Sequence, residues 1–189
     1  QYLLPGKINS GKDHVGSIGE KKSEILKVSR CSKIKFNVPD IWIKNFKWPL
    51  MNDHKYKRGH VLVRSGPMPS TGASRLAAIS ALRSGAGAVT LASKTTALKV
   101  NASHLTSVML KEINTEDEFF NFAKQKKINT LIIGPGNGVD KKTKNIAIRA
   151  IKEEFGLILD ADGLTSFEKN PKQLFDLLKK RKKRDNVIL

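Results

Sequence analysis

Cysteine is almost absent from this chain of 189 residues, and long apolar runs are absent altogether. The single cysteine, Cys31, excludes an intramolecular disulfide and fits a reducing compartment, so we expect a cytoplasmic protein. No apolar stretch reaches the roughly 18–20 residues of a membrane span, so we expect no membrane partner. The N-terminal residues 1–5 lack the pattern of a signal peptide and a start methionine, and we expect further chain before them.

Acidic residues are scarce. Only 17 aspartates and glutamates face 35 lysines and arginines, which gives a net charge of +18. Such an excess can indicate nucleic-acid binding. However, the basic residues are spread over the whole chain, aromatics are only 6% of residues, and no zinc-ligand or RNA-recognition pattern occurs. We therefore expect a small-molecule partner, and we interpret the densest basic run, 179–184, as a solvated helix end.

The apolar pattern predicts strands that alternate with helices. Expected strands cover 60–65, 88–93, 106–110, 129–133 and 157–159, and another starts at 187. Expected helices cover 72–85, 116–127, 141–154 and a segment around Leu174, whereas 95–104 has no clear pattern. This alternation is typical of an α/β fold with a mostly parallel sheet flanked by helices. Such sheets bind ligands at the carboxyl ends of their strands.

The first loop at such an end is Ser65–Ala73, which joins a strand to a helix starting near Gly72. Free N–H groups at a helix N-terminus attract anions, and a glycine lets a ligand approach the backbone. The alternative is an ordinary connection with Ser70 or Thr71 as the helix N-cap. The helix is expected to end through a glycine in the small-residue segment 84–88.

The second loop, Gly134-Pro-Gly-Asn-Gly138, follows a buried strand. Its glycines leave N–H groups free to form an anion-binding concavity, although the spacing is not that of a dinucleotide-binding fingerprint. The alternative is a tight turn that needs positive φ. We favour ligand contact because the loop lies at the carboxyl end of its strand.

The third loop, Leu159-Asp-Ala-Asp-Gly163, places two carboxylates two residues apart. They could hold Mg²⁺ through water or organise a phosphate site. Equally, Asp160 could cap the next helix while Asp162 is solvated. None of the histidines pairs at metal-ligand spacing, so the sequence names no metal site.

Taken in order, these motifs resemble the nucleotide-dependent NAD(P)H-hydrate dehydratases, a ribokinase-like family of metabolite-repair enzymes. The resemblance covers roughly residues 50–189. It depends on His54-Lys55, Val61-Leu-Val63, Thr71-Gly-Ala73, Arg83-Ser-Gly-Ala-Gly-Ala-Val-Thr90, Ile133-Gly-Pro-Gly-Asn-Gly138 and Leu159-Asp-Ala-Asp-Gly-Leu164.

This resemblance implies an activity. Members of the family use ADP or ATP, with Mg²⁺, to return hydrated NADH or NADPH to the reduced cofactor. The hydroxyl of the hydrated ring is thought to be phosphorylated, after which phosphate leaves. The protein then contributes positioning and charge stabilisation.

The resemblance also assigns site residues by position. Gly72, Ala73, Gly136 and Gly138 would line the substrate cleft. The vicinity of the nucleotide phosphate or metal would include Asn137, Asp160 and Asp162.

The chain departs from the family at its end. The Pro-His-x-Gly-Glu and Gly-Thr-Gly-Asp segments, the second of which carries the catalytic aspartate, do not occur in these residues. We therefore assign no catalytic residue and expect 54–189 to be the N-terminal part of a dehydratase domain, truncated at its C-terminus and inactive alone. The complete enzyme is expected to be a homo-oligomer.

The N-terminal segment resembles the tail of an NAD(P)H-hydrate epimerase domain. The match rests on Leu3-Leu-Pro-Gly6 and Val15-Gly-Ser-Ile-Gly19, where Ser17 replaces the usual acidic residue. We expect this tail over 1–30 and a connector over 31–53, as in a bifunctional repair enzyme.

Two other functions remain open at this point. A ribokinase-like small-molecule kinase, such as a vitamin-precursor kinase, would share the fold and the glycine loops. A basic, non-catalytic RNA-binding module would explain the charge.

Overall fold

The computed structural model describes residues 38–46, 48–182 and 186–189. The chain divides into two compact units, the first ending at Trp48 and the second running from Pro49 to Leu189. In the first unit the described residues form the short helix α2 (Pro39–Trp42) and the 3-10 turn η2 (Ile43–Asn45). The expected epimerase tail, 1–30, and the start of the expected connector, 31–37, lie outside the described residues.

The second unit is built on a six-stranded sheet in the order β3-β2-β1-β4-β5-β6, and every neighbouring pair is parallel. The strands are β1 (His60–Arg64), β2 (Ala88–Ser93), β3 (Met109–Glu112), β4 (Thr130–Ile133), β5 (Gly156–Leu159) and β6 (Val187–Ile188). The expected α/β class with a parallel sheet is confirmed.

Helices precede the first strand and connect the others. They are the 3-10 turns η3 (Lys55–Arg58) and η4 (Met68–Ser70) and the α-helices α3 (Thr71–Arg83), α4 (Thr95–His104), α5 (Glu116–Gln125), α6 (Lys141–Lys152), α7 (Asp162–Thr165) and α8 (Pro171–Lys180). Among the described helices, none is long and apolar enough to cross a membrane.

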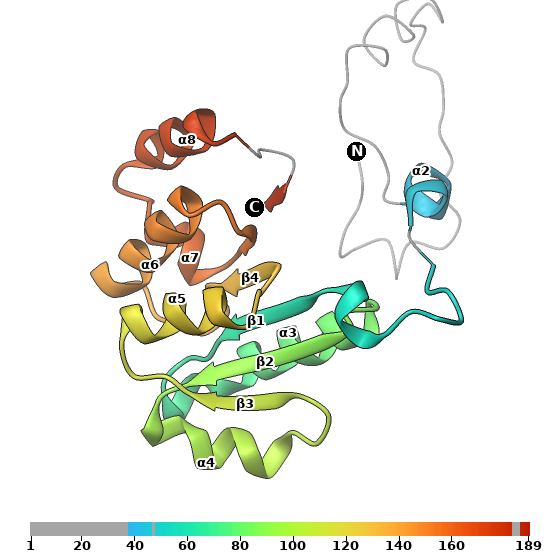
Figure 1. Cartoon of the computed structure of the whole chain (residues 1–189). Coiled ribbons are helices and arrows are strands. Elements are labelled where there is room, and N and C mark those ends of the chain that lie inside the picture. The colour runs from blue at the N-terminus through green and yellow to red at the C-terminus, as the bar shows by residue number, and fades with distance from the viewer. Residues whose placement is uncertain (1–37, 47, 183–185) are drawn as a thin grey trace, which may run out of the picture. The chain divides into compact units, whose positions relative to one another are not determined.

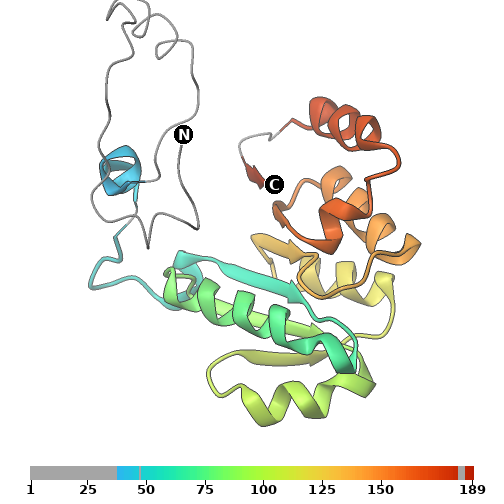
Figure 2. The ribbon, with the colours of Figure 1, turned by 180° about the vertical axis from the view of Figure 1, so that it is seen from behind.

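Two apolar layers form because side chains alternate across each strand. Leu62, Leu131 and Leu157 stand in register and belong to a core that contains Phe119, Phe120 and the buried face of α6. The residues that follow them on the strands point the other way, where Val63 and Ile132 pack with α3. Figures 1 and 2 show α3 behind the sheet from one side and in front of it from the other.

Local sequence sets where the helices begin and end. Thr115 accepts a hydrogen bond from the Glu118 N–H, and Asp140 accepts one from the Thr143 N–H, so both cap their helices. At the end of α3, Gly85 has a φ of 104°, and Ala86 N–H bonds back to the Ala81 carbonyl. This is the predicted glycine helix ending.

One helix was not predicted, and one strand was predicted at the wrong position. Residues 95–104, which show no pattern, form α4, because its buried positions are Ala97 and the polar Asn101 rather than an apolar stripe. The strand expected at 106–110 lies at 109–112, an edge strand whose own residues are mostly exposed. The buried Val108 and Ile113 flank it instead, so no alternation marks its bounds.

The basic run 179–184 is not simply a solvated helix end. Arg181 is buried, and its Nη1 donates to the Ile151 carbonyl at 2.9 Å and the Ala150 carbonyl at 3.4 Å. Its Nη2 donates to the Phe155 carbonyl. The guanidinium thus binds free carbonyl groups at the C-terminal end of α6, a favourable place for a cation.

Candidate functional site

The sheet has a topological switch point between β1 and β4. The chain proceeds from β1 outward through β2 to β3, returns to β4 beside β1, and then continues in the opposite direction to β5 and β6. Parallel sheets of this order bind ligands outside the carboxyl ends of the two strands at the switch. The loops that follow β1 and β4 are the first two predicted loops, so the fold brings them together.

These two loops pack directly on each other. A Cβ placed on Gly66 would lie 2.0 Å from the Gly136 carbonyl oxygen, and one on Gly136 would lie 2.5 Å from the Ser70 carbonyl oxygen. The two backbones can approach this closely only because these two positions carry no side chain. Two of the glycines therefore serve the approach of one loop to the other.

Asn137 holds the arrangement together. It is buried, its Oδ1 accepts a hydrogen bond from Gly134 N–H at 3.0 Å, and its Nδ2 donates to the carbonyls of Arg64 at 3.0 Å and Pro135 at 3.2 Å. The amide thus connects β1 to the loop after β4. The structure gives this side chain three protein partners and little exposure.

The third loop joins the same edge through backbone contact. A Cβ on Gly134 would lie 1.7 Å from the Asp160 carbonyl oxygen, so only glycine fits there. The Gly138 N–H donates to Asp162 Oδ2 at 2.8 Å. The alternative, in which Asp160 caps the next helix and Asp162 is solvated, is not what the structure has. Ala161 is the N-cap of α7, no side chain caps it, and Asp162 is half-buried in the first turn.

The predicted substrate residues lie around this contact. Gly72 and Ala73 are exposed in the first turn of α3, and Ala73 Cβ is 3.6 Å from the position a Cβ on Gly136 would take. Gly138 is exposed and has open space on its side-chain direction. The fold therefore brings Gly72, Ala73 and Gly136 together, and it places Gly138 with Asp162.

The helix cap that was the alternative interpretation of the first loop does not form. Ser70 stands at the N-cap position of α3, but no side-chain hydrogen bond caps the helix. The hydroxyl of Ser74, within the first turn, lies 3.4 Å from the Gly66 N–H, which donates to it. Because no side chain caps α3, N–H groups in its first turn remain without a side-chain acceptor, as an anion site requires.

A metal centre is not formed by the side chains that the structure describes. No group of three or more histidine, cysteine, aspartate or glutamate side chains lies close enough together to bind an ion. Asp160 and Asp162 offer two carboxylates, and one of them already accepts from Gly138.

Sequence reasoning missed polar groups behind the loops. Asn101 of α4 is fully buried, and its Nδ2 donates to the hydroxyls of Ser65 and Ser93, at the ends of β1 and β2, each at 2.9 Å. Arg64 ends β1 and donates from Nη1 to Thr143 Oγ1 at 3.1 Å. In the sequence, Arg64 could be recognised only as a single arginine at the end of an apolar strand.

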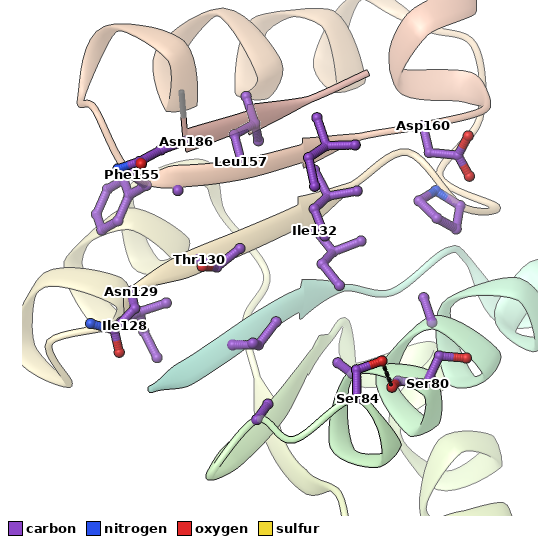
Figure 3. Close-up of a pocket in the computed structure, with 18 of the residues that line it drawn as sticks. Ser80, Ser84, Ile128, Asn129, Thr130, Ile132, Phe155, Leu157, Asp160 and Asn186 are labelled. Atoms are coloured by element: carbon purple, nitrogen blue, oxygen red, sulfur yellow. Dashed lines mark hydrogen bonds between the residues drawn. The ribbon is translucent and has the colours of Figure 1, made fainter. Parts of the chain in front are cut away.

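A cavity of about 1040 Å³ lies mostly away from these loops. It covers the sheet face beside α3, over β4 and β5, and reaches the carboxyl edge only at Pro135 and Asp160. Figure 3 shows Ile132 near its middle and Asp160 at one end. Its lining combines apolar residues with polar ones such as Ser80, Asn129 and Glu153. Most of this lining lies away from the carboxyl edge, where parallel sheets of this order bind ligands.

Comparison with known proteins identifies the family of this chain. A family model described as NAD(P)H-hydrate dehydratase matches residues 61–189. The chain is 30% identical over 123 residues to the bifunctional NAD(P)H-hydrate repair enzyme Nnr of Coxiella burnetii, covering 65% of this chain and 25% of that protein. It is 31% identical over 126 residues to the ADP-dependent (S)-NAD(P)H-hydrate dehydratase of Staphylococcus aureus, covering 65% and 45%. The chain thus spans less than half the length of these relatives.

Solved structures share the fold. A hypothetical protein from Streptococcus mutans superposes with a TM-score of 0.57 at 26% identity, over 70% of this chain and 49% of that one. A Bacillus subtilis ADP/ATP-dependent NAD(P)H-hydrate dehydratase, co-crystallised with ATP and Mg²⁺, gives 0.55 at 20% identity, over 69% and 48%. With a family model that matches well over half of its residues, the chain belongs to the NAD(P)H-hydrate dehydratase family.

Proposed function

We propose that this chain takes part in the nucleotide-dependent dehydration of hydrated NADH and NADPH, a lyase reaction of metabolite repair. The observation that carries the proposal is the family match over residues 61–189. The two loops that meet at the switch point are the part of the fold where such a ligand would bind. Neither the kinase nor the RNA-binding alternative is favoured by these matches.

The substrate would lie against Gly72, Ala73, Gly136 and Gly138. Three of these residues are exposed at the carboxyl edge, and none of the four has a side chain larger than a methyl group. A bound dinucleotide could therefore approach the backbone closely there. Partly unpaired N–H groups at the start of α3 would face its phosphates.

Asn137, Asp160 and Asp162 would lie near the nucleotide phosphates. Because all the contacts of the Asn137 side chain are to backbone, its part would be to hold the Gly134–Gly138 loop in shape. Asp162 would orient the same loop through the Gly138 N–H. Asp160 remains available to solvent and ligands.

The co-substrate would be ADP or ATP with Mg²⁺. This follows from relatives named ADP-dependent and from the Bacillus subtilis protein that was crystallised with ATP and Mg²⁺. The nucleotide would supply the phosphoryl group that turns the ring hydroxyl into a good leaving group. The described residues alone do not make a metal site, so no step is assigned to the ion.

The remaining assignments follow the family. Residues 54–189 would form the N-terminal part of the dehydratase domain, after a connector at 31–53 and an epimerase tail at 1–30. The complete protein would act in the cytoplasm as a homo-oligomer on a small-molecule substrate.

Binding of hydrated NADH tests the proposal. Ala73→Glu should weaken binding at least ~10-fold, because a charged side chain would enter the cleft and repel the phosphates, a loss of about 1.4 kcal/mol. The helix itself should tolerate the change, since acidic residues are favourable in a first turn. Calorimetric titration of the chain with hydrated NADH measures the effect.

Ala102→Glu is the matched control, because Ala102 is exposed on α4 and the substitution is the same. Equal weakening by both variants, or no saturable binding by the unmodified chain, would count against the proposal. Adding ADP or ATP with Mg²⁺ to this chain alone should not restore NADH absorbance, since the catalytic-aspartate motif of the family is not among its residues.

A further inference from the structure

A second cavity at the carboxyl edge contains an arginine that the proposed reaction does not use. Its volume is about 270 Å³, and its lining includes Arg64, Lys94, Glu116 and Lys142. Arg64 ends β1 two residues after Leu62, so both side chains extend to the same side of the sheet, the side covered by α5 and α6. The predicted substrate residues are not part of this lining.

The guanidinium of Arg64 is largely unpaired. Nη1 donates to Thr143 Oγ1, a neutral acceptor, and among the residues that the structure describes no carboxylate lies within 4.0 Å of it. Its remaining N–H groups have no protein acceptor in that part of the chain, and they can serve a bidentate anion. Burial lowers the pKa of Arg64, partly offset by the charges of Asp140 and Glu116.

The rest of the cavity is also positive. Lys94 immediately precedes α4, whose N-terminus adds a partial positive charge, and Lys142 lies in the first turn of α6. The N-terminus of α6 is itself capped by the Asp140 carboxylate. Glu116 is the one acidic residue of the lining, and Arg149 Nη1 already lies 3.4 Å from its Oε1. Three cationic side chains from separate elements therefore surround a small space with one partly neutralised carboxylate.

We propose that this cavity is a binding site for a phosphoryl anion, with the Arg64 guanidinium as its central ligand. The volume is below the range of drug-sized pockets, so it admits a phosphate or pyrophosphate group rather than a whole dinucleotide. A forked guanidinium with two ammonium groups supplies donors in several directions, as a tetrahedral phosphate requires. The site does not depend on the proposed dehydratase activity.

Inorganic pyrophosphate is the probe. Titration of the isotope-labelled chain should shift the Arg64 Nε–Hε resonance saturably, and calorimetry should give the dissociation constant. Arg64→Gln should raise that constant at least ~10-fold, which equals about 1.4 kcal/mol, in the range of a charged hydrogen bond. Inorganic phosphate should compete for the same site, and citrate should compete less well.

Lys169→Gln is the matched control, because it removes the same charge from an exposed lysine outside the cavity. It should change the constant less than ~2-fold, since isolated surface charges are screened. The double variant Lys94→Gln, Lys142→Gln alters only exposed positions and tests the site even if Arg64→Gln does not fold. Equal weakening by Lys169→Gln, an unshifted Arg64 resonance, or equally tight citrate would overturn the assignment.

Discussion

At the scale of single residues, the glycines of the predicted loops divide into two kinds. Gly66, Gly134 and Gly136 have no room for a side chain because backbone from another loop occupies the space. Gly72 and Gly138 have open space instead. Glycine-rich loops were recognisable in the sequence, but which glycine faces a loop and which faces solvent depends on contacts between distant segments.

A pair of alanine substitutions tests this division. Gly134→Ala should lower the free energy of unfolding by at least about 3 kcal/mol, because its Cβ would collide with backbone and its φ is 127°. Gly138→Ala should cost only about 1–2 kcal/mol, the strain of a positive φ without a collision. Urea denaturation measures both, and similar losses would contradict the packing described for Gly134.

His60 supplies a prediction about pH. It is 5% exposed, its Nε2 lies 2.8 Å from Thr90 Oγ1, and burial, with smaller contributions from the charges of Lys55 and Lys126, lowers its pKa from 6.5. In the unfolded chain the imidazole is protonated first as the pH falls. Its contribution to stability is therefore present above about pH 6.5 and is lost as the pH falls toward the lower pKa of the folded state.

The measurement is the urea midpoint at pH 7.5 and at pH 5.5. The unmodified chain should lose more stability between these values than His60→Gln, whose side chain does not titrate. Identical losses in the two proteins would show that His60 is not held neutral.

Polar residues behind the loops could not be assigned from the sequence. Arg64 and Asn101 are a single charge and a single amide within segments that otherwise show strand or irregular patterns. Their meaning depends on Thr143, Ser65 and Ser93, which the fold brings close from other elements. No spacing along one segment reveals such partners.

At the scale of elements, apolar periodicity located most of the fold. The central strands and the helices α5 and α6 lie within a few residues of their predicted positions, because each buries a regular apolar face. Helix α3 also lies near its predicted position, although two of its three buried residues, Thr71 and Ser74, are polar. Helix α4 was missed because a buried amide replaces part of that face. The edge strand β3 was misplaced because little of it is buried.

The C-terminal end of α6 supplies a prediction at this scale. Arg181→Ala should lower the free energy of unfolding by about 2–4 kcal/mol, since it leaves buried carbonyls of Ile151 and Phe155 without their charged donor. Lys180→Ala, at an exposed neighbour, should change it by less than about 0.5 kcal/mol. Urea denaturation separates the two, and equal effects would mean that the basic run is solvated after all.

At the scale of the whole molecule, the strand order explains why separate sequence motifs share one site. The loops after β1 and β4 are about seventy residues apart in the chain, yet they meet because the sheet reverses direction between these strands. The parallel class and the carboxyl-end rule could be predicted. The switch point could not, because periodicity carries no information on which strands become neighbours.

The large cavity beside α3 did not follow from the sequence either. It arises because α3 packs with Val63, while the same face over β4 and β5, including Ile158, remains partly open (Figure 3). The sequence predicts that these strands are apolar. It does not say which helix covers them.

We propose above that the carboxyl-edge loops of this chain bind hydrated NADH. The most direct test follows the amide resonances of the isotope-labelled chain as hydrated NADH is added. We expect saturable shifts at Gly72, Ala73 and Gly138, with no shift at Asn129, beside the amino end of β4. Saturable binding that leaves Gly72, Ala73 and Gly138 unshifted, or no binding at all, would contradict it.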